Sequence, residues 1–66
     1  MPKARRVLRK FYSLGFFADH RKGSHRKLKH ADGRQVTFAY HDNVDLTMIQ
    51  LAKIAKQAGC RVEDLL

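Results

Sequence analysis

Apolar residues recur at helical spacing at the start of the chain. Five of them form one stripe, in which each lies three or four positions from another member: Ala4, Val7, Leu8, Phe11 and Leu14. Gly15 follows the stripe directly, and glycine most easily takes the left-handed backbone that ends many helices. The spacing therefore predicts a helix over residues 3–14.

A second helix is predicted near the end of the chain, where both of its limits are marked. Thr47 is suited to cap the first turn, and Gln50, three residues on, completes a capping box. Leu46 and Leu51 stand where a hydrophobic staple places its two members. Gly59 ends the pattern, and the tail that follows is expected to add a short turn whose leucines pack back. The apolar face of this helix comprises Met48, Leu51, Ala52, Ile54, Ala55 and Ala58.

Between the helices the apolar positions alternate, which is the pattern of half-buried β-strands. The two faces of residues 25–30 are His25, Lys27 and Lys29 on one side, and Arg26, Leu28 and His30 on the other. The apolar face of residues 35–40 is Val36, Phe38 and Tyr40. Asp32-Gly33 between them is a strong hairpin signal. Residues 16–21 lie between two glycines, and we expect them to form a further strand.

The order α-β-β-β-α predicts an α+β fold in a single domain over residues 1–66. Its simplest packing is a three-stranded antiparallel sheet with two helices on one face, with Phe11, Phe16 and Phe38 in the core. The other face is then open and carries polar and basic side chains. This is the layout of double-stranded-RNA-binding domains, which read RNA shape and phosphates rather than base sequence.

Charge is concentrated in the first half of the chain. Residues 1–34 hold eleven Lys and Arg against two acids, whereas residues 35–66 hold three against four, and the net charge is +8. Such a field attracts polyanions, so nucleic acid is the leading partner, with an acidic protein or an anionic membrane surface as alternatives. No signal peptide is visible, and no stretch approaches the roughly 20 apolar residues of a membrane span. We therefore expect a cytoplasmic protein that does not enter a membrane.

Residues 21–27 combine a tight turn, several cations and one histidine. Gly23 and Ser24 form the expected turn, whose backbone N–H groups and hydroxyl can hold a phosphate. His25 stands at its edge, and histidine is the side chain whose ordinary pKa lies near neutrality. It can take a proton from an RNA 2′-hydroxyl and start attack on the adjacent phosphate, while Arg and Lys stabilise the negative charge. Such a site needs no metal and no cofactor, and leaves a 2′,3′-cyclic phosphate.

Several stretches carry a resemblance to a known family: KGSHRKLKH, then DGRQVTF, then a histidine after a strand, then IAKQAG near the end. With these stretches in this order, the chain resembles the HicA family of toxin–antitoxin ribonucleases, from Val7 to about Leu65. The resemblance implies the α-β-β-β-α fold, cleavage of mRNA with arrest of growth, and a HicB-type antitoxin that covers the site. The family's catalytic histidine falls on His25.

The expected site therefore has His25 as its catalytic residue, with RNA contacts around it. These contacts are Lys22, Gly23, Ser24, Arg26, Lys27, Lys29, Arg5 and Arg9. Arg5 and Arg9 are like charges at i,i+4 on the predicted first helix, and a bound phosphate would relieve their repulsion. His41 is an accessory candidate that could contact RNA or antitoxin.

Two positions depart from the family's pattern. The family usually has a proline two residues before its second histidine, whereas Ala39 stands before Tyr40-His41 here. The following segment, DNVDLT, is acidic where the family often has Lys or Gly. We therefore expect a looser loop after the third strand, while the Gly23-Ser24-His25 turn stays intact.

Other readings of these residues stay open. His25 could simply cap the hairpin, and we expect His20 and His30 to be strand residues at the sheet surface. The histidines and Cys60 show no pair at close zinc-ligand spacing, and Cys60 is expected to be a small, buried helix-end residue. Three functions compete: a metal-independent ribonuclease toxin, a non-catalytic RNA-binding module of the same fold, and a protein whose basic face serves an acidic partner.

Overall fold

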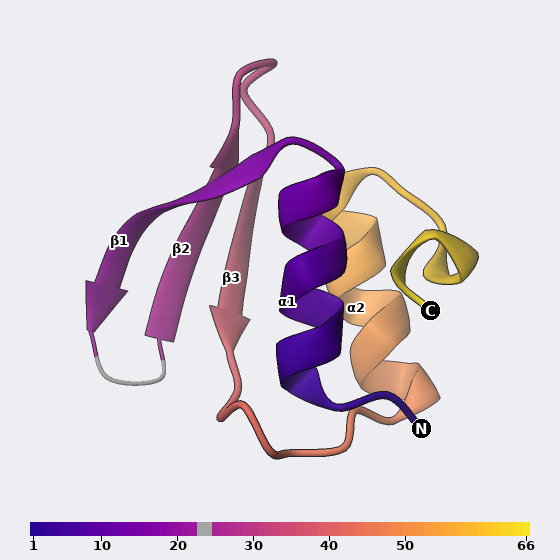
Figure 1. The fold of residues 1–66 in the computed structure, drawn as a ribbon. Helices are drawn as coiled ribbons and strands as arrows, with labels where there is room; N and C mark the ends of the chain where they lie inside the picture. The colour runs from indigo at the N-terminus through magenta and orange to yellow at the C-terminus, as the bar shows by residue number, and fades with distance from the viewer. Residues whose placement is uncertain (23–24) are drawn as a thin grey trace.

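The computed structural model describes the backbone of residues 1–22 and 25–66, and the side chains of residues 1–19 and 25–66. Its elements follow the predicted order (Figure 1). They are α1 (Ala4–Ser13), β1 (Phe16–Lys22), β2 (His25–His30), β3 (Gln35–Ala39), α2 (Met48–Ala58) and a short 3₁₀ turn (Val62–Leu65). The α+β fold resembles that of double-stranded-RNA-binding domains, as the sequence predicts.

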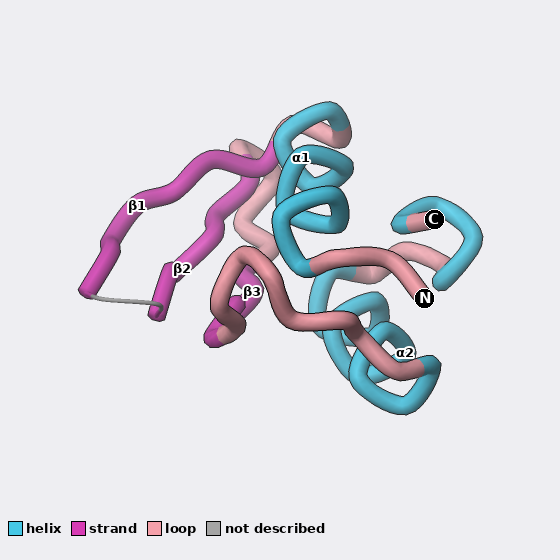
Figure 2. Tube along the Cα trace, turned by 60° about the horizontal axis from the view of Figure 1, so that its bottom comes forward, coloured by secondary structure: helices cyan, strands magenta, loops and turns pink. Residues whose placement is uncertain are grey.

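The three strands form an antiparallel sheet in the order β1-β2-β3. Leu28 of β2 lies opposite Ala18 of β1 and Val36 of β3, and Asp19 is the extra residue of a bulge in β1. Both helices lie beside the sheet on one side (Figure 2). The burial of β2 and β3 alternates accordingly, so that Leu28 and Val36 are covered while Lys27, Gln35 and Thr37 are exposed.

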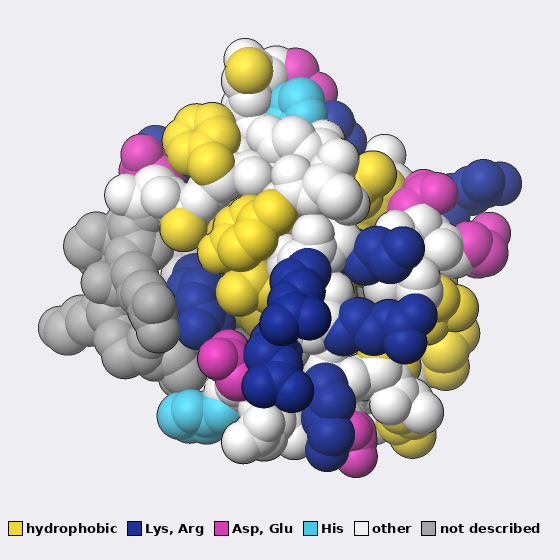
Figure 3. Space-filling model, in the orientation of Figure 1, with side chains coloured by type: hydrophobic (Ala, Val, Ile, Leu, Met, Phe, Trp, Pro, Cys, Tyr) yellow, Lys and Arg dark blue, Asp and Glu magenta, His cyan; other side chains and the backbone are white. Residues whose placement is uncertain are grey.

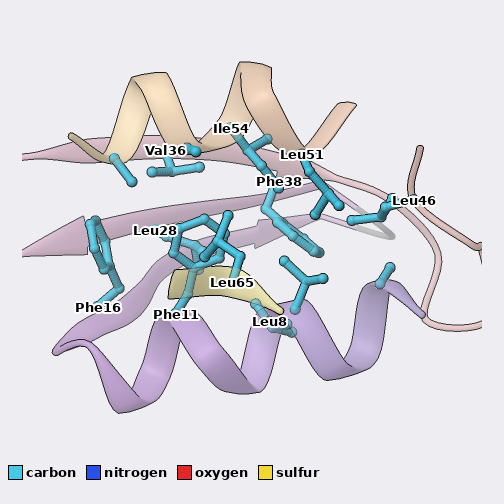
Figure 4. Close-up of a cluster of buried hydrophobic side chains, with 14 residues drawn as sticks. Leu8, Phe11, Phe16, Leu28, Val36, Phe38, Leu46, Leu51, Ile54 and Leu65 are labelled. Carbon is cyan, nitrogen blue, oxygen red and sulfur yellow. The ribbon is translucent and has the colours of Figure 1, made fainter. Parts of the chain in front are cut away.

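The core fills the space between the covered face of the sheet and the two helices (Figure 4). Phe11 of α1 stands at its centre, with its ring edge-on to Phe16 at 5.4 Å and to Phe38 at 6.0 Å between ring centroids. Edge-on contact is a favoured arrangement of aromatic rings and adds to the gain from burying them. The three phenylalanines predicted to be core are all buried.

The first turn of α1 has no side-chain cap. Instead, the backbone N–H of Ala4 donates to the carbonyl of Val44 at 2.8 Å, and that of Arg5 donates to the carbonyl of Asp42 at 3.1 Å. Backbone from a segment about 40 residues later thus satisfies donors that every helix start leaves free. At the other end, Leu14 lies beyond the helix and is 38% exposed, so the buried stripe is one residue shorter than predicted.

Helix α2 carries the predicted caps. The backbone N–H of Gln50 donates to Thr47 Oγ1 at 3.2 Å, and the Thr47 N–H donates to Gln50 Oε1 at 2.8 Å, which completes the capping box. Gly59 adopts φ 66°, and the Cys60 N–H donates to the Ala55 carbonyl at 3.0 Å, as in a Schellman motif. Cys60 is half-buried, and burial raises the pKa of its thiol.

The junction of α1 and β1 differs from the prediction at His30. Its side chain is 20% exposed and stands edge-on to Phe16, with 5.0 Å between ring centroids. Its Nε2 lies 3.1 Å from the Leu14 carbonyl oxygen, and a Cβ added at Gly15 would lie 2.7 Å from the same nitrogen. His30 therefore closes one edge of the core, and the prediction of a sheet-surface histidine is wrong at this position.

Candidate nucleic-acid interface

His25 begins β2 on the open face of the sheet. It pairs with Ala39 of β3 and with Lys22 of β1, and its side chain is exposed. Lys27, two residues on, shares this face and is exposed as well. The predicted alternation of β2 is thus confirmed, and it places an imidazole and an ammonium group on the face that the helices leave uncovered.

The described part of the open face is less basic than the sequence suggests, and it includes an aromatic ring. Lys29 is half-buried, and its Nζ lies 3.0 Å from Asp19 Oδ2. Phe17, the pairing partner of Lys29, is 49% exposed. Phe17 was not among the predicted site residues, although in a half-buried strand one of two consecutive phenylalanines must leave the core. Exposed rings of this kind can stack on nucleic-acid bases.

Helix α1 presents a row of cations to the solvent. Arg5 and Arg9 are exposed, and Lys and Arg side chains gather over this helix (Figure 3). Within the described residues, no ion pair of 4.0 Å or less includes Arg5, Arg6, Arg9 or Lys10. Their charges are therefore available to an anionic partner.

Arg26 does not lie with these cations. It is only 6% exposed, on the covered face beside Leu28, and its Nη2 lies 3.2 Å from Asp42 Oδ1. Its Nη1 is buried without a hydrogen-bond partner. This position does not fit the expected role as a phosphate contact, because an anion on the open face cannot reach a guanidinium on the other side of the sheet.

The segment after β3, residues 41–46, is anchored rather than loose. The Val44 N–H donates to the His41 carbonyl at 3.1 Å and closes a turn. The two acidic residues of the segment form ion pairs, Asp42 with the buried Arg26 and Asp45 with Lys3 at 3.1 Å. The acidic departure from the family's pattern thus has a structural role, and His41 is exposed at the start of a segment that is held at several points.

Three predicted contacts are not located. Gly23 and Ser24 lie outside the described residues, and for Lys22 only the backbone is described, as the end of β1 opposite His25. No helix in residues 1–22 and 25–66 is long and apolar enough to cross a membrane.

The fold and the charge define the class of the protein: a small, basic α+β domain with the layout of double-stranded-RNA-binding domains. The model of a protein family, the HicA toxin of bacterial toxin–antitoxin systems, matches residues 4–60 of the 66. The chain therefore belongs to the HicA toxin family, and membership in a toxin–antitoxin family implies a toxin role and an antitoxin partner. The comparison with curated proteins found no match.

Proposed function

We propose that this toxin is a metal-independent mRNA endoribonuclease, an mRNA interferase, in which His25 is the catalytic residue. The observation that carries the proposal is the position of His25, exposed at the start of β2 on the uncovered face of the sheet. A long, flexible polyanion can reach an imidazole there without any rearrangement of the core. The matched toxin family supports the same function.

The chemistry uses the nucleophile that RNA itself carries. The imidazole of His25 takes the proton of a 2′-hydroxyl, the 2′ oxygen forms a bond to the adjacent phosphorus, and the bond from phosphorus to the 5′ oxygen breaks. The 5′ oxygen takes up a proton from an acid at the site or from water and leaves as a hydroxyl, and the other product ends in a 2′,3′-cyclic phosphate. Because the attacking oxygen comes from the substrate, no metal-bound water is required.

The surrounding cations bind the RNA backbone in this proposal. Lys27 is the exposed cation nearest to His25 along β2, and Lys22 is its pairing neighbour on β1. Lys29 is a further proposed contact on the sheet, and Arg5 and Arg9 are proposed contacts from helix α1 rather than from the open face. Gly23 and Ser24, which lie outside the described residues, are proposed to contact a phosphate. Arg26 is omitted from this set because it is buried in an ion pair.

The proposed regulator is a HicB-type antitoxin that covers the open face. A protein bound there would block His25 and the surrounding lysines together, without altering the core. Since the substrate is mRNA, the proposed site of action is the cytoplasm.

The ends of the products test this proposal. A defined mRNA is incubated in EDTA with the protein, and the fragments are analysed for a 2′,3′-cyclic phosphate and a 5′-hydroxyl. A matched RNA with a single 2′-deoxy nucleotide at the mapped cleavage site should resist cutting there, because its nucleophile is missing. Binding of RNA without any cleavage would contradict the proposal and favour a non-catalytic RNA-binding module.

A further inference from the structure

Alternation of inward and outward side chains continues beyond the end of β3. Tyr40 is half-buried against the core, edge-on to Phe38 with 5.3 Å between ring centroids. Asp42 is exposed, and its carboxylate meets the guanidinium of the buried Arg26. His41 follows the inward-facing Tyr40 and is exposed. It therefore lies on the open side, as Ala39 does.

Continuing the extended backbone of β3 by two residues places His41 diagonally from His25. Ala39 is the pairing partner of His25, and His41 follows Ala39 by two residues. Diagonal neighbours on one face of an antiparallel pair lie about 7–8 Å apart. Two imidazoles at that spacing can approach one phosphodiester from different sides without touching each other.

The backbone that carries His41 is held on both sides. Before it, Tyr40 packs against the core, and after it the Arg26–Asp42 ion pair and the hydrogen bond from the Arg5 N–H to the Asp42 carbonyl fix the next residue. A catalytic group needs such support, because a side chain displaced by 1 Å loses much of its effect. The buried, incompletely paired Arg26 thus contributes to the site by anchoring the residue that follows His41.

We propose that His41 is a second catalytic residue of the same reaction, the acid that protonates the leaving 5′ oxygen. This inference rests on the proposed ribonuclease function. While His25 takes the 2′ proton and the new bond to phosphorus forms, the imidazolium of His41 gives its proton to the 5′ oxygen as the old bond breaks. A single imidazole on the nucleophile's side cannot supply this proton in the same step. Histidine suits the role because it is partly protonated near neutral pH, whereas Lys and Arg hold their protons.

The leaving group provides a specific test. We compare single-turnover cleavage of ordinary RNA with that of RNA in which sulfur replaces the 5′ bridging oxygen at the cleavage site. A thiolate leaves without protonation, so an enzyme that lacks its acid should still cut the sulfur substrate. His41→Ala should slow cleavage of ordinary RNA by about 10²- to 10⁴-fold and cleave the sulfur substrate at nearly the wild-type rate. His25→Ala should be slow on both substrates.

Asn43→Ala is the matched control, because Asn43 is exposed in the same segment and has no proposed role. It should cleave both substrates like the wild type. Thermal unfolding monitored by circular dichroism establishes that each variant is folded. Equal slowing of His41→Ala on both substrates, or none on ordinary RNA, would overturn the role of His41 while leaving the ribonuclease function intact. Absence of cleavage by the wild type would instead overturn the proposed function, and this inference with it.

Discussion

The two faces of the sheet are built from alternate residues of the same strands, yet they differ in their exposure to solvent and in the accessibility of their charges. His25 and Arg26 are neighbours in the sequence: the first is exposed on an open face, and the second is 6% exposed under two helices. A count of positive charges treats Arg26 and Lys27 alike, but only Lys27 is accessible to a polyanion. A slip of one residue in register would exchange the two faces, so the position of the candidate site depends on the packing of the core.

The largest effect on stability should come from removing a buried side chain on the covered face of the sheet. Phe38→Ala removes a fully buried ring that contacts Phe11, and it should lower the free energy of unfolding by about 3–5 kcal/mol. Thr37→Ala, one residue earlier on the open face, should change it by no more than about 0.5 kcal/mol. Urea unfolding of both variants measures the difference. Similar losses for the two variants would mean that the faces are not distinct.

A smaller effect on stability is expected at Gly15, which lies against the His30 side chain at one edge of the core. Gly15→Ala places a methyl group against His30 at a backbone φ of 96°, and it should destabilise the protein by about 2 kcal/mol or more. Gly33→Ala is the matched control, since its φ is 97° and nothing lies within 4 Å of the added carbon. Thermal unfolding should show a greater loss for Gly15→Ala. Equal losses of stability would mean that backbone strain alone destabilises both variants, and that the contact with His30 contributes nothing.

The Arg26–Asp42 pair should contribute little to stability. Arg26→Met keeps the apolar stem and removes a guanidinium that is only partly hydrogen-bonded, while the half-exposed Asp42 stays hydrated. We expect the free energy of unfolding to change by no more than about 1 kcal/mol. Arg26→Ala also loses the packing of the stem and should be destabilised by about 2 kcal/mol. A large loss in Arg26→Met under urea would show that the ion pair, rather than the stem, stabilises this position.

The smallest effect on stability is expected at Asp32, in the turn between β2 and β3. The backbone N–H of Arg34 donates to Asp32 at 3.1 Å and lowers the pKa of that carboxyl below 3.8, against the effect of desolvation. A lowered pKa stabilises the fold above the ordinary pKa, and this stabilisation is lost as the pH falls below it. The melting temperature of the wild type should therefore drop more steeply below about pH 3.8 than that of Asp32→Asn. Parallel curves would show that this hydrogen bond does not contribute in solution.

Local signals in the sequence account for the order of elements and for most of their limits. The capping box at Thr47, the left-handed Gly59 and the alternation of β2 are each visible within a few residues, and the structure contains them all. Leu14, Met48 and Ala52 were assigned to the apolar faces of the two helices and are exposed, because the periodicity does not show where a helix turns away from its neighbours.

The surroundings of the candidate site depend on pairs that are remote in the sequence. Asp42 meets Arg26, and Asp45 meets Lys3, so the acidic segment after β3 could not be recognised as anchored from its own residues. The burial of Arg26 was signalled by its alternation with Lys27, but its positive charge suggested a role in RNA binding. Phe17 was missed, although the predicted burial of Phe16 already implied that its neighbour in the strand is exposed.

The most direct test of the account is the cleavage rate of a defined mRNA, in EDTA, by the wild type and by His25→Ala. Circular dichroism shows that the variant is folded, and its affinity is measured on a non-cleavable RNA. We expect that the wild type cuts, and that the folded variant binds RNA as tightly but cuts at least about 10²-fold more slowly. A folded His25→Ala protein that cuts at the wild-type rate would contradict it.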